Sequence, residues 1–302
     1  MILKTSRPYG FFLNAIKWKL LAIVVLTLLV GYLDDVLYKI FDFDLAIPAF
    51  FGTAIILSLA FRTNKAYNRW WEAKIIWESI VNSSRTWTRL VLRLIHAPKG
   101  KNSSVKGLQE QLIFRQLAWN YILEKRLRDK PPLKGMDAYL DEHDLSYLSG
   151  IDNGNQGLLF LQSRDLMGAY KKGQLDLFEH VELEEVLRDL ETAMGKAERI
   201  KKTHFPVLYD ILFELSIYIF CVLLTYAIRD STTIFESLFS IIITTLFMMM
   251  NEIARDMQDP FEDLPTDTPM LALSHEVERS VMQFLDRKEL SKPDYEGSFY
   301  IK

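Results

Sequence analysis

The stretch from residue 48 to residue 71 constrains the fold of this chain more than any other. Its first half, Pro48 to Phe61, carries no charge, whereas its second half begins with Arg62 and is basic and rich in tryptophan. A charged side chain is costly inside a bilayer, so a helix running through both halves would leave hydrocarbon near Arg62. We therefore expect the rest of the chain to surround a helix that crosses a membrane boundary.

Composition excludes several classes of protein. Apolar blocks lie near both ends of the chain and a charged block separates them, while the net charge is only −3. A charge this small gives no argument for nucleic acid as a partner. Cys221 is the only cysteine, which excludes an intrachain disulfide, and its apolar surroundings predict a small buried side chain. Residues 1–19 mix basic and aromatic side chains, which is typical of a membrane interface rather than of a cleavable signal peptide.

Four apolar blocks predict four transmembrane helices, at residues 20–33, 48–61, 206–228 and 232–250. The first block is shorter than the roughly 20 residues that a spanning helix needs. Trp18 and Tyr32 at its ends would complete it, because aromatic side chains favour membrane interfaces. Short connections join the blocks in pairs, so the sequence predicts two membrane hairpins.

Charge gives the hairpins an orientation. Basic residues precede the first block and follow the second, whereas the connection between them is acidic. Basic flanks stay in the cytoplasm, so we expect both termini there and the acidic loop outside, in a cell inner membrane or plasma membrane. The acidic residues of this outer loop are Asp34, Asp35, Asp42 and Asp44.

The central block predicts a large helical cytoplasmic domain. Helical periodicity continues from the membrane to about residue 95 and recurs at 108–128, 156–172, 175–202 and 270–285, and no stretch alternates as a strand does. Residues 136–148 predict one or two short helices, with a capping pattern at Asp137. The expected fold class is all-α, divided into residues 1–61, 62–205, 206–250 and 251–302.

No motif indicates an enzyme. The five histidines have no metal-ligand spacing, and the chain has neither a phosphate-binding glycine loop nor a nucleophile elbow, so no cofactor is expected. His180 and Glu184 lie one helical turn apart, as on an ordinary solvated face. Asp210 and Glu214 share this spacing inside the third apolar block. Either they face the bundle interior or water, or the membrane begins beyond Pro206 and leaves them at its interface.

The second apolar block also suggests a pore. Thr53, Leu57 and Phe61 share one helical face, and the small residues around them would let neighbouring helices approach closely. A ring of such helices would form a hydrophobic constriction that can gate a channel. The alternative is that these side chains simply face lipid or the protein core.

Three motifs resemble the bestrophin family, specifically its bacterial branch. The first reads Phe-Arg-Thr-Asn-x-x-Tyr-x-Arg-Trp-Trp-Glu-Ala from Phe61, the second reads Pro-x-x-Tyr from Pro206 with an aromatic run to Cys221, and the third contains Asp259-Pro260-Phe261. They occur in the expected order over nearly the whole chain. The resemblance implies a homopentameric ion channel with one axial pore.

The resemblance also implies where the pore narrows. Its membrane neck would consist of Thr53, Leu57 and Phe61, although Thr53 departs from the large apolar residue expected there. A second, cytoplasmic constriction would fall near Leu175 or Phe178. The basic residues Arg62, Lys65 and Arg69 would anchor the inner leaflet or line the inner vestibule.

Animal members of the family bind calcium with acidic residues just after the fourth membrane helix. The corresponding residues here are Asp259, Glu262, Asp263 and Asp267, fewer carboxylates than that dense run. Calcium prefers six to eight oxygen ligands, so calcium activation is not carried over to this chain.

The family is generally known for chloride channels, yet the sequence leaves the sign of the permeant ion open. Rings of outer aspartates favour cations, whereas Phe61 could present the electropositive edge of its ring to an anion. We expect passive conduction of small monovalent ions across the lipid bilayer. The rival functions are a non-conducting scaffold or signalling protein and a secondary transporter, for which no internal repeat is evident.

Overall fold

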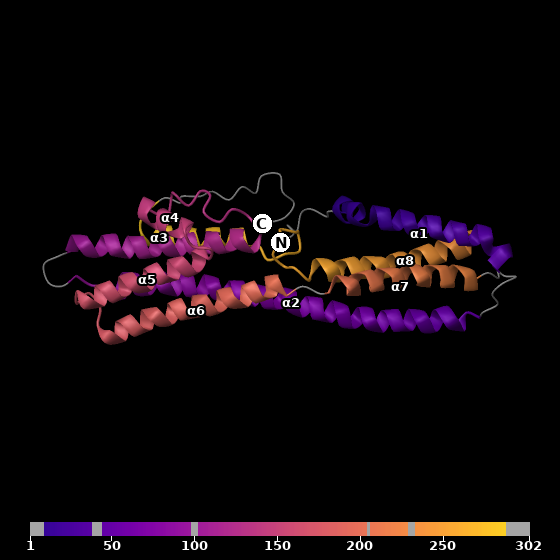
Figure 1. Cartoon of the computed structure of the whole chain (residues 1–302), viewed down its shortest axis with the longest axis horizontal. Coiled ribbons are helices and arrows are strands. Elements are labelled where there is room, and N and C mark those ends of the chain that lie inside the picture. The colour runs from indigo at the N-terminus through magenta and orange to yellow at the C-terminus, as the bar shows by residue number, and fades with distance from the viewer. Residues whose placement is uncertain (1–8, 38–43, 98–101, 204–205, 229–232, 288–302) are drawn as a thin grey trace. The chain divides into compact units, whose positions relative to one another are not determined.

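The structure is a computed structural model that describes residues 9–37, 44–97, 102–203, 206–228 and 233–287. Within these residues it is entirely helical and contains no strand, which confirms the all-α prediction (Figure 1). The helices are α1 (Tyr9–Leu37), α2 (Ala46–Leu94), α3 (Asn102–Leu127), α4 (Glu142–Ser149), α5 (Gly154–Lys171), α6 (Leu177–Lys202), α7 (Val207–Ala227), α8 (Thr233–Asp256) and α9 (Met270–Phe284).

The chain forms two compact units. The hairpin unit holds residues 4–70 and 204–259, and the helical unit holds residues 1–3, 71–203 and 260–302. Helix α2 contributes residues to both. The division that we expect from membrane boundaries, at 61/62, 205/206 and 250/251, stays a prediction, because compactness and membrane depth are different properties.

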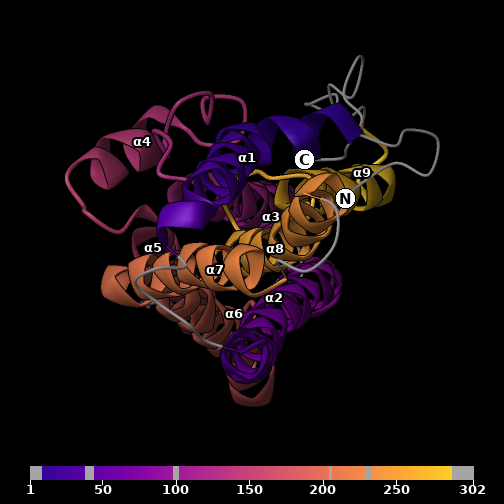
Figure 2. The same ribbon diagram turned by 90° about the vertical axis from the view of Figure 1, so that its right-hand side faces the viewer.

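The hairpin unit contains all four helices that are long and apolar enough to cross a membrane. Helices α1, α7 and α8 pack side by side, as both views show (Figures 1 and 2). Their shared core includes Ile23, Ile217, Phe220 and Met248, and Ile55 of α2 joins it. Cys221 is buried there as predicted. Helix α1 begins at Tyr9 and continues through the first apolar block without a break, so the described part of the segment expected at the membrane interface belongs to the same helix as that block.

The helical unit is organised by buried tryptophans. Trp77, Trp87 and Trp119 are almost fully buried, and the indole Nε1 of Trp87 donates a hydrogen bond to the Leu112 carbonyl at 3.2 Å. A buried indole N–H usually has such a partner. The bond thus ties α2 to α3 at the centre of this core.

Side-chain caps set two helix starts that periodicity alone places differently. Helix α6 begins at Leu177 rather than at residue 175, because Asp176 and Glu179 form a capping box with two bonds of 2.8 Å. The capping pattern expected at Asp137 is wrong: Asp141 caps α4 by accepting from the Asp144 amide at 2.7 Å. Within residues 136–148 only the segment from Glu142 onward is α-helical.

Gly52 allows α2 to approach α7 closely, which gives a first testable prediction. A β-carbon at Gly52 would lie 2.8 Å from Cε2 of Phe220, a buried ring that also packs against Phe247. We expect Gly52→Ala to lower the free energy of unfolding by about 1–2 kcal/mol through overpacking. Thermal unfolding of the purified protein would measure this change.

Gly31 provides the matched control, because it lies in α1 with nothing within 4 Å of an added β-carbon. Gly31→Ala should leave stability unchanged or raise it slightly, since alanine is the better helix former. Equal stabilisation by both substitutions would contradict the close approach at Gly52.

Candidate functional site

The first part of α2 has two opposite faces. Ile55, Leu59 and Arg62 are buried in the hairpin unit, whereas the side chains of Leu57 and Phe61 are 58% and 68% exposed. Thr53 is also exposed, and its hydroxyl donates to the Ala49 carbonyl at 2.8 Å within the same helix. The three predicted neck residues therefore share a face that the folded hairpin unit leaves uncovered. Such a face suits either a pore or lipid.

The three basic residues predicted as an inner cluster differ in their surroundings. Arg62 is buried, forms an ion pair with Asp210 of α7, and lies 5.2 Å from the centre of the Phe213 ring. Arg69 donates from Nε to the Gln258 carbonyl at 3.0 Å. Lys65 is exposed. Arg62 thus belongs to the interior of the hairpin unit, unlike the exposed Lys65.

Asp210 and Glu214 both face basic side chains of the same bundle. Asp210 pairs with Arg62, and Glu214 accepts from the Lys19 Nζ at 2.7 Å. The same Lys19 Nζ lies 2.5 Å from Glu252 of α8, which also pairs with Arg255. Whether the two carboxylates face the bundle interior or lie at the membrane interface stays a prediction, since each is 31% exposed. Ionisable residues in membrane helices usually pair in this way.

The partners of these acidic residues are functional neighbours that the sequence reasoning missed. Lys19 is separated from Glu214 and Glu252 by 195 and 233 residues. The sequence contained one signal for these pairs. Asp210 and Glu214 lie inside an apolar block and need positively charged partners, and Lys19 and Arg62 each adjoin an apolar block.

The two candidates for a cytoplasmic constriction occupy different environments. The side chain of Leu175 is only 5% exposed and belongs to the core of the helical unit, whereas Phe178 is 83% exposed. Leu177 and Val181 are also exposed beside Phe178 on the first turns of α6. Of the two, Phe178 is the one able to reach a pore, and Leu177 and Val181 extend the same apolar strip.

The predicted outer acidic loop is shorter than expected. Asp34 and Asp35 continue α1, which corrects their assignment to a loop, and their side chains lie outside the described residues, as does all of Asp42. Asp44 is exposed and accepts from the Leu45 amide at 2.7 Å.

The acidic residues after α8 have protein partners. In the helical unit, Asp263 lies 3.3 Å from Arg128 and 3.6 Å from Lys130, and Asp267 accepts from the Leu264 amide at 2.9 Å. Glu262 is exposed, and Asp259 belongs to the hairpin unit. These contacts tie Asp263 and Asp267 to the helical unit.

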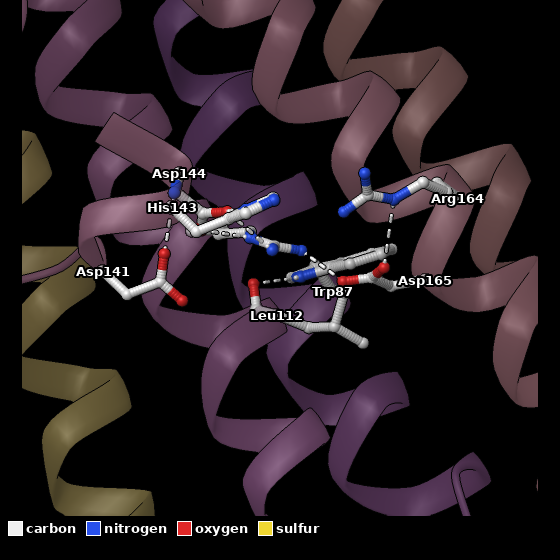
Figure 3. A network of polar contacts seen from close by, with 8 residues as sticks. Trp87, Leu112, Asp141, His143, Asp144, Arg164 and Asp165 are labelled. Carbon is white, nitrogen blue, oxygen red and sulfur yellow. Dashed lines mark hydrogen bonds and ion pairs between the residues drawn. The ribbon is translucent and has the colours of Figure 1, made fainter. Parts of the chain in front are cut away.

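One cluster in the helical unit does resemble a metal site, and it is formed by Asp141, His143 and Asp144 (Figure 3). Asp141 is the cap of α4, and the buried Asp144 binds Arg115 through two bonds of 2.6 and 2.8 Å. Arg115 also reaches Asp165 at 2.5 Å. Burial lowers the pKa of the Arg115 guanidinium, but bonds and charge from Asp144 and Asp165 raise it by more, so its net pKa lies above the ordinary value. The buried Asp144 is thus bound by Arg115, whereas Asp141 and His143 are exposed.

These features define a class: an all-helical membrane protein with four membrane-length helices and a compact helical unit of its own. Comparison with known proteins gives the family. A model described as "Bacterial/Fungal Bestrophin protein" matches residues 5–283, so the chain belongs to the bacterial and fungal bestrophin family.

Individual relatives agree with this assignment. The chain is 26% identical over 248 residues to the voltage-dependent anion channel-forming protein YneE of Escherichia coli K12, which covers 82% of this chain and 79% of that one. It is 27% identical over 234 residues to a voltage-dependent anion channel-forming protein of Mesorhizobium japonicum, covering 78% and 73%. The crystal structure of a bacterial bestrophin homologue from Klebsiella pneumoniae has the same fold, with a TM-score of 0.82 at 21% identity over 90% of this chain and 99% of that chain.

Proposed function

We propose that this protein is a bestrophin-type ion channel that passes small monovalent ions passively. Five copies would surround one axial pore in a cell inner membrane or plasma membrane, with both termini in the cytoplasm. The observation that carries the proposal is the uncovered face of α2, on which Thr53, Leu57 and Phe61 follow one another at one-turn spacing. Apolar side chains exposed on a helix need a partner surface, lipid or a shared pore axis.

The proposed neck would control ion flow because water leaves a narrow apolar constriction and closes the pore to ions. Rings of Leu57 and Phe61 would form a narrow apolar constriction, which resists wetting when closed. Thr53 would make the outer ring less dry than the other two. Phe178 would form a second ring at the cytoplasmic end of the pore.

We expect anions to be the permeant ions. Relatives of this chain carry the name anion channel-forming protein, and aromatic edges in the Phe61 ring would favour negative charge. Cations are the second candidate, because Asp44 is exposed next to the start of α2 and would repeat around the mouth.

The first test is the reversal potential of the purified protein in planar bilayers under a salt gradient. A reversal near the chloride potential is expected, and a reversal near the cation potential would make Asp44 the first residue to mutate. Absence of current from intact oligomers would support a scaffold instead. Saturable uptake coupled to a counter-ion would support a transporter.

The second test is the neck itself. Replacing Leu57 and Phe61 together with alanine should raise the conductance severalfold, because a wider constriction wets more easily. Ile56→Ala is the control, since Ile56 is 54% exposed on the same helix and its side chain points about 100° away from that of Leu57. Equal conductance in wild type and the double variant would contradict the assignment of the neck.

A further inference from the structure

The hairpin unit contains a cavity of about 450 Å³. It lies between α2 and α7, and its lining includes Phe61, Arg62, Lys65 and Tyr209. A second cavity of about 340 Å³ shares Ser58, Tyr209 and Phe213 with it and is otherwise lined mainly by apolar residues. The two cavities form one cleft with a basic end and an apolar end.

The basic end contains a buried side chain with unused donors. The Arg62 side chain is only 4% exposed and forms one ion pair, from Nη2 to Asp210. Its Nε and Nη1 atoms have no hydrogen-bond partner among the described residues. Unsatisfied donors on a buried cation are costly, so an acceptor in the cavity would stabilise this end. A guanidinium edge matches the oxygens of a phosphate or carboxylate.

The charge at this end suits a monoanion. Arg62 and Lys65, both basic, line this end of the cleft, and Asp210 of α7 pairs with Arg62. A phosphodiester carries a single negative charge and suits two bases beside one carboxylate.

The cleft has its charged end and its apolar end in the same order along α2 as the headgroup and acyl chains of a membrane lipid. Arg62 is the first charged residue after the uncharged run from Ala46 to Phe61. The second cavity continues along this uncharged part of α2, past Ala54 and Phe51, toward Leu212 of α7. Tyr209 borders both cavities, and tyrosine is a side chain that favours membrane interfaces.

We propose that this cleft binds a monoanionic glycerophospholipid, with the phosphate on Arg62 and Lys65 and part of an acyl chain in the apolar cavity. A free phosphate ion would use the same basic end but not the apolar one. The proposal depends on insertion of the hairpin unit into a membrane and not on ion conduction, so it can fail while the channel function holds.

Native mass spectrometry and thermal unfolding of the detergent-purified oligomer would test the proposal. The probes are dioleoyl phosphatidylglycerol, dioleoyl phosphatidylcholine and inorganic phosphate. We expect phosphatidylglycerol to bind and raise the unfolding midpoint, and phosphatidylcholine and inorganic phosphate to have little effect. Equal effects of the two lipids, or full stabilisation by phosphate alone, would overturn the proposal.

Two variants locate the site. Lys65→Gln, at an exposed position, and the double variant Arg62→Met with Asp210→Asn, which removes both members of the ion pair, should each weaken phosphatidylglycerol binding about tenfold or more. Lys17→Gln is the control, because Lys17 is an exposed base of α1 outside the cleft. Ser58 lines both cavities, so the larger side chain of Ser58→Trp should fill the space where they meet and also displace the lipid. Undiminished binding in these cleft variants would overturn the assignment.

Discussion

Replacing Arg115 with methionine is expected to lower the free energy of unfolding of the helical unit by about 3–5 kcal/mol. The guanidinium is 2% exposed and is the partner of both Asp144 and Asp165. Asp144 is equally buried, so its carboxylate would keep the cost of burial and lose its counter-charge. Chemical denaturation of the purified protein, followed by tryptophan fluorescence, would measure the loss, since Trp87 and Trp119 lie in the same core.

Two further variants make this prediction specific. Arg164→Met removes an exposed arginine whose contact with Asp165 is 3.5 Å, and it should change stability by less than about 1 kcal/mol. Combining Arg115→Met with Asp144→Asn removes both charges of the Arg115–Asp144 ion pair. This double variant should recover part of the stability that Arg115→Met loses. If Arg115→Met cost no more than Arg164→Met, the buried network would not stabilise the unit.

Replacing Lys19 with methionine should destabilise the hairpin unit by about 3 kcal/mol. Lys19 is the shared partner of Glu214 and Glu252, which come from α7 and α8. Its removal would leave Glu214 without this counter-charge and Glu252 with Arg255 alone. The expected result is a lower unfolding midpoint of the detergent-purified protein and a reduced yield of intact oligomer.

Lys17→Met is the control for this second prediction. Lys17 lies on the same helix, is exposed, and contacts the Trp18 ring at 5.8 Å. Its loss should have little effect on the midpoint. Adding Glu214→Gln to Lys19→Met should restore part of the stability, because the carboxylate that loses its lysine partner is then neutral. Equal effects of the two lysine variants would show that the ionic cluster does not hold the bundle together.

Hydropathy, charge and helix breakers were enough to predict the elements of this fold. The uncharged run before Arg62 predicted one helix that passes from an apolar to a polar environment, and α2 does so without a break from Ala46 to Leu94. The four membrane-length helices and the absence of strands among the described residues follow from the same local signals. Local patterns suffice here because the period of the apolar residues reports a helix directly.

The environment of single residues was less predictable. Leu175 and Phe178 are three residues apart and equally apolar, yet only the first enters the core, because the cap at Asp176 starts α6 between them. Likewise, Lys17 and Lys19 are only two residues apart, although Lys19 joins an ionic cluster and Lys17 is exposed. Such differences depend on contacts with segments that are distant in sequence.

The burial of Arg62 next to the exposed Phe61 has a mechanical consequence. Neighbouring residues of an α-helix point about 100° apart, so turning α2 to move Phe61 would also turn Arg62 away from Asp210. That turn would separate a buried charge pair, whereas a change of the Phe61 side-chain rotamer would leave the pair intact. The ion pair would therefore resist rotation of α2 about its axis. It favours opening of the proposed neck by rotamer changes of single side chains over rotation of the whole helix.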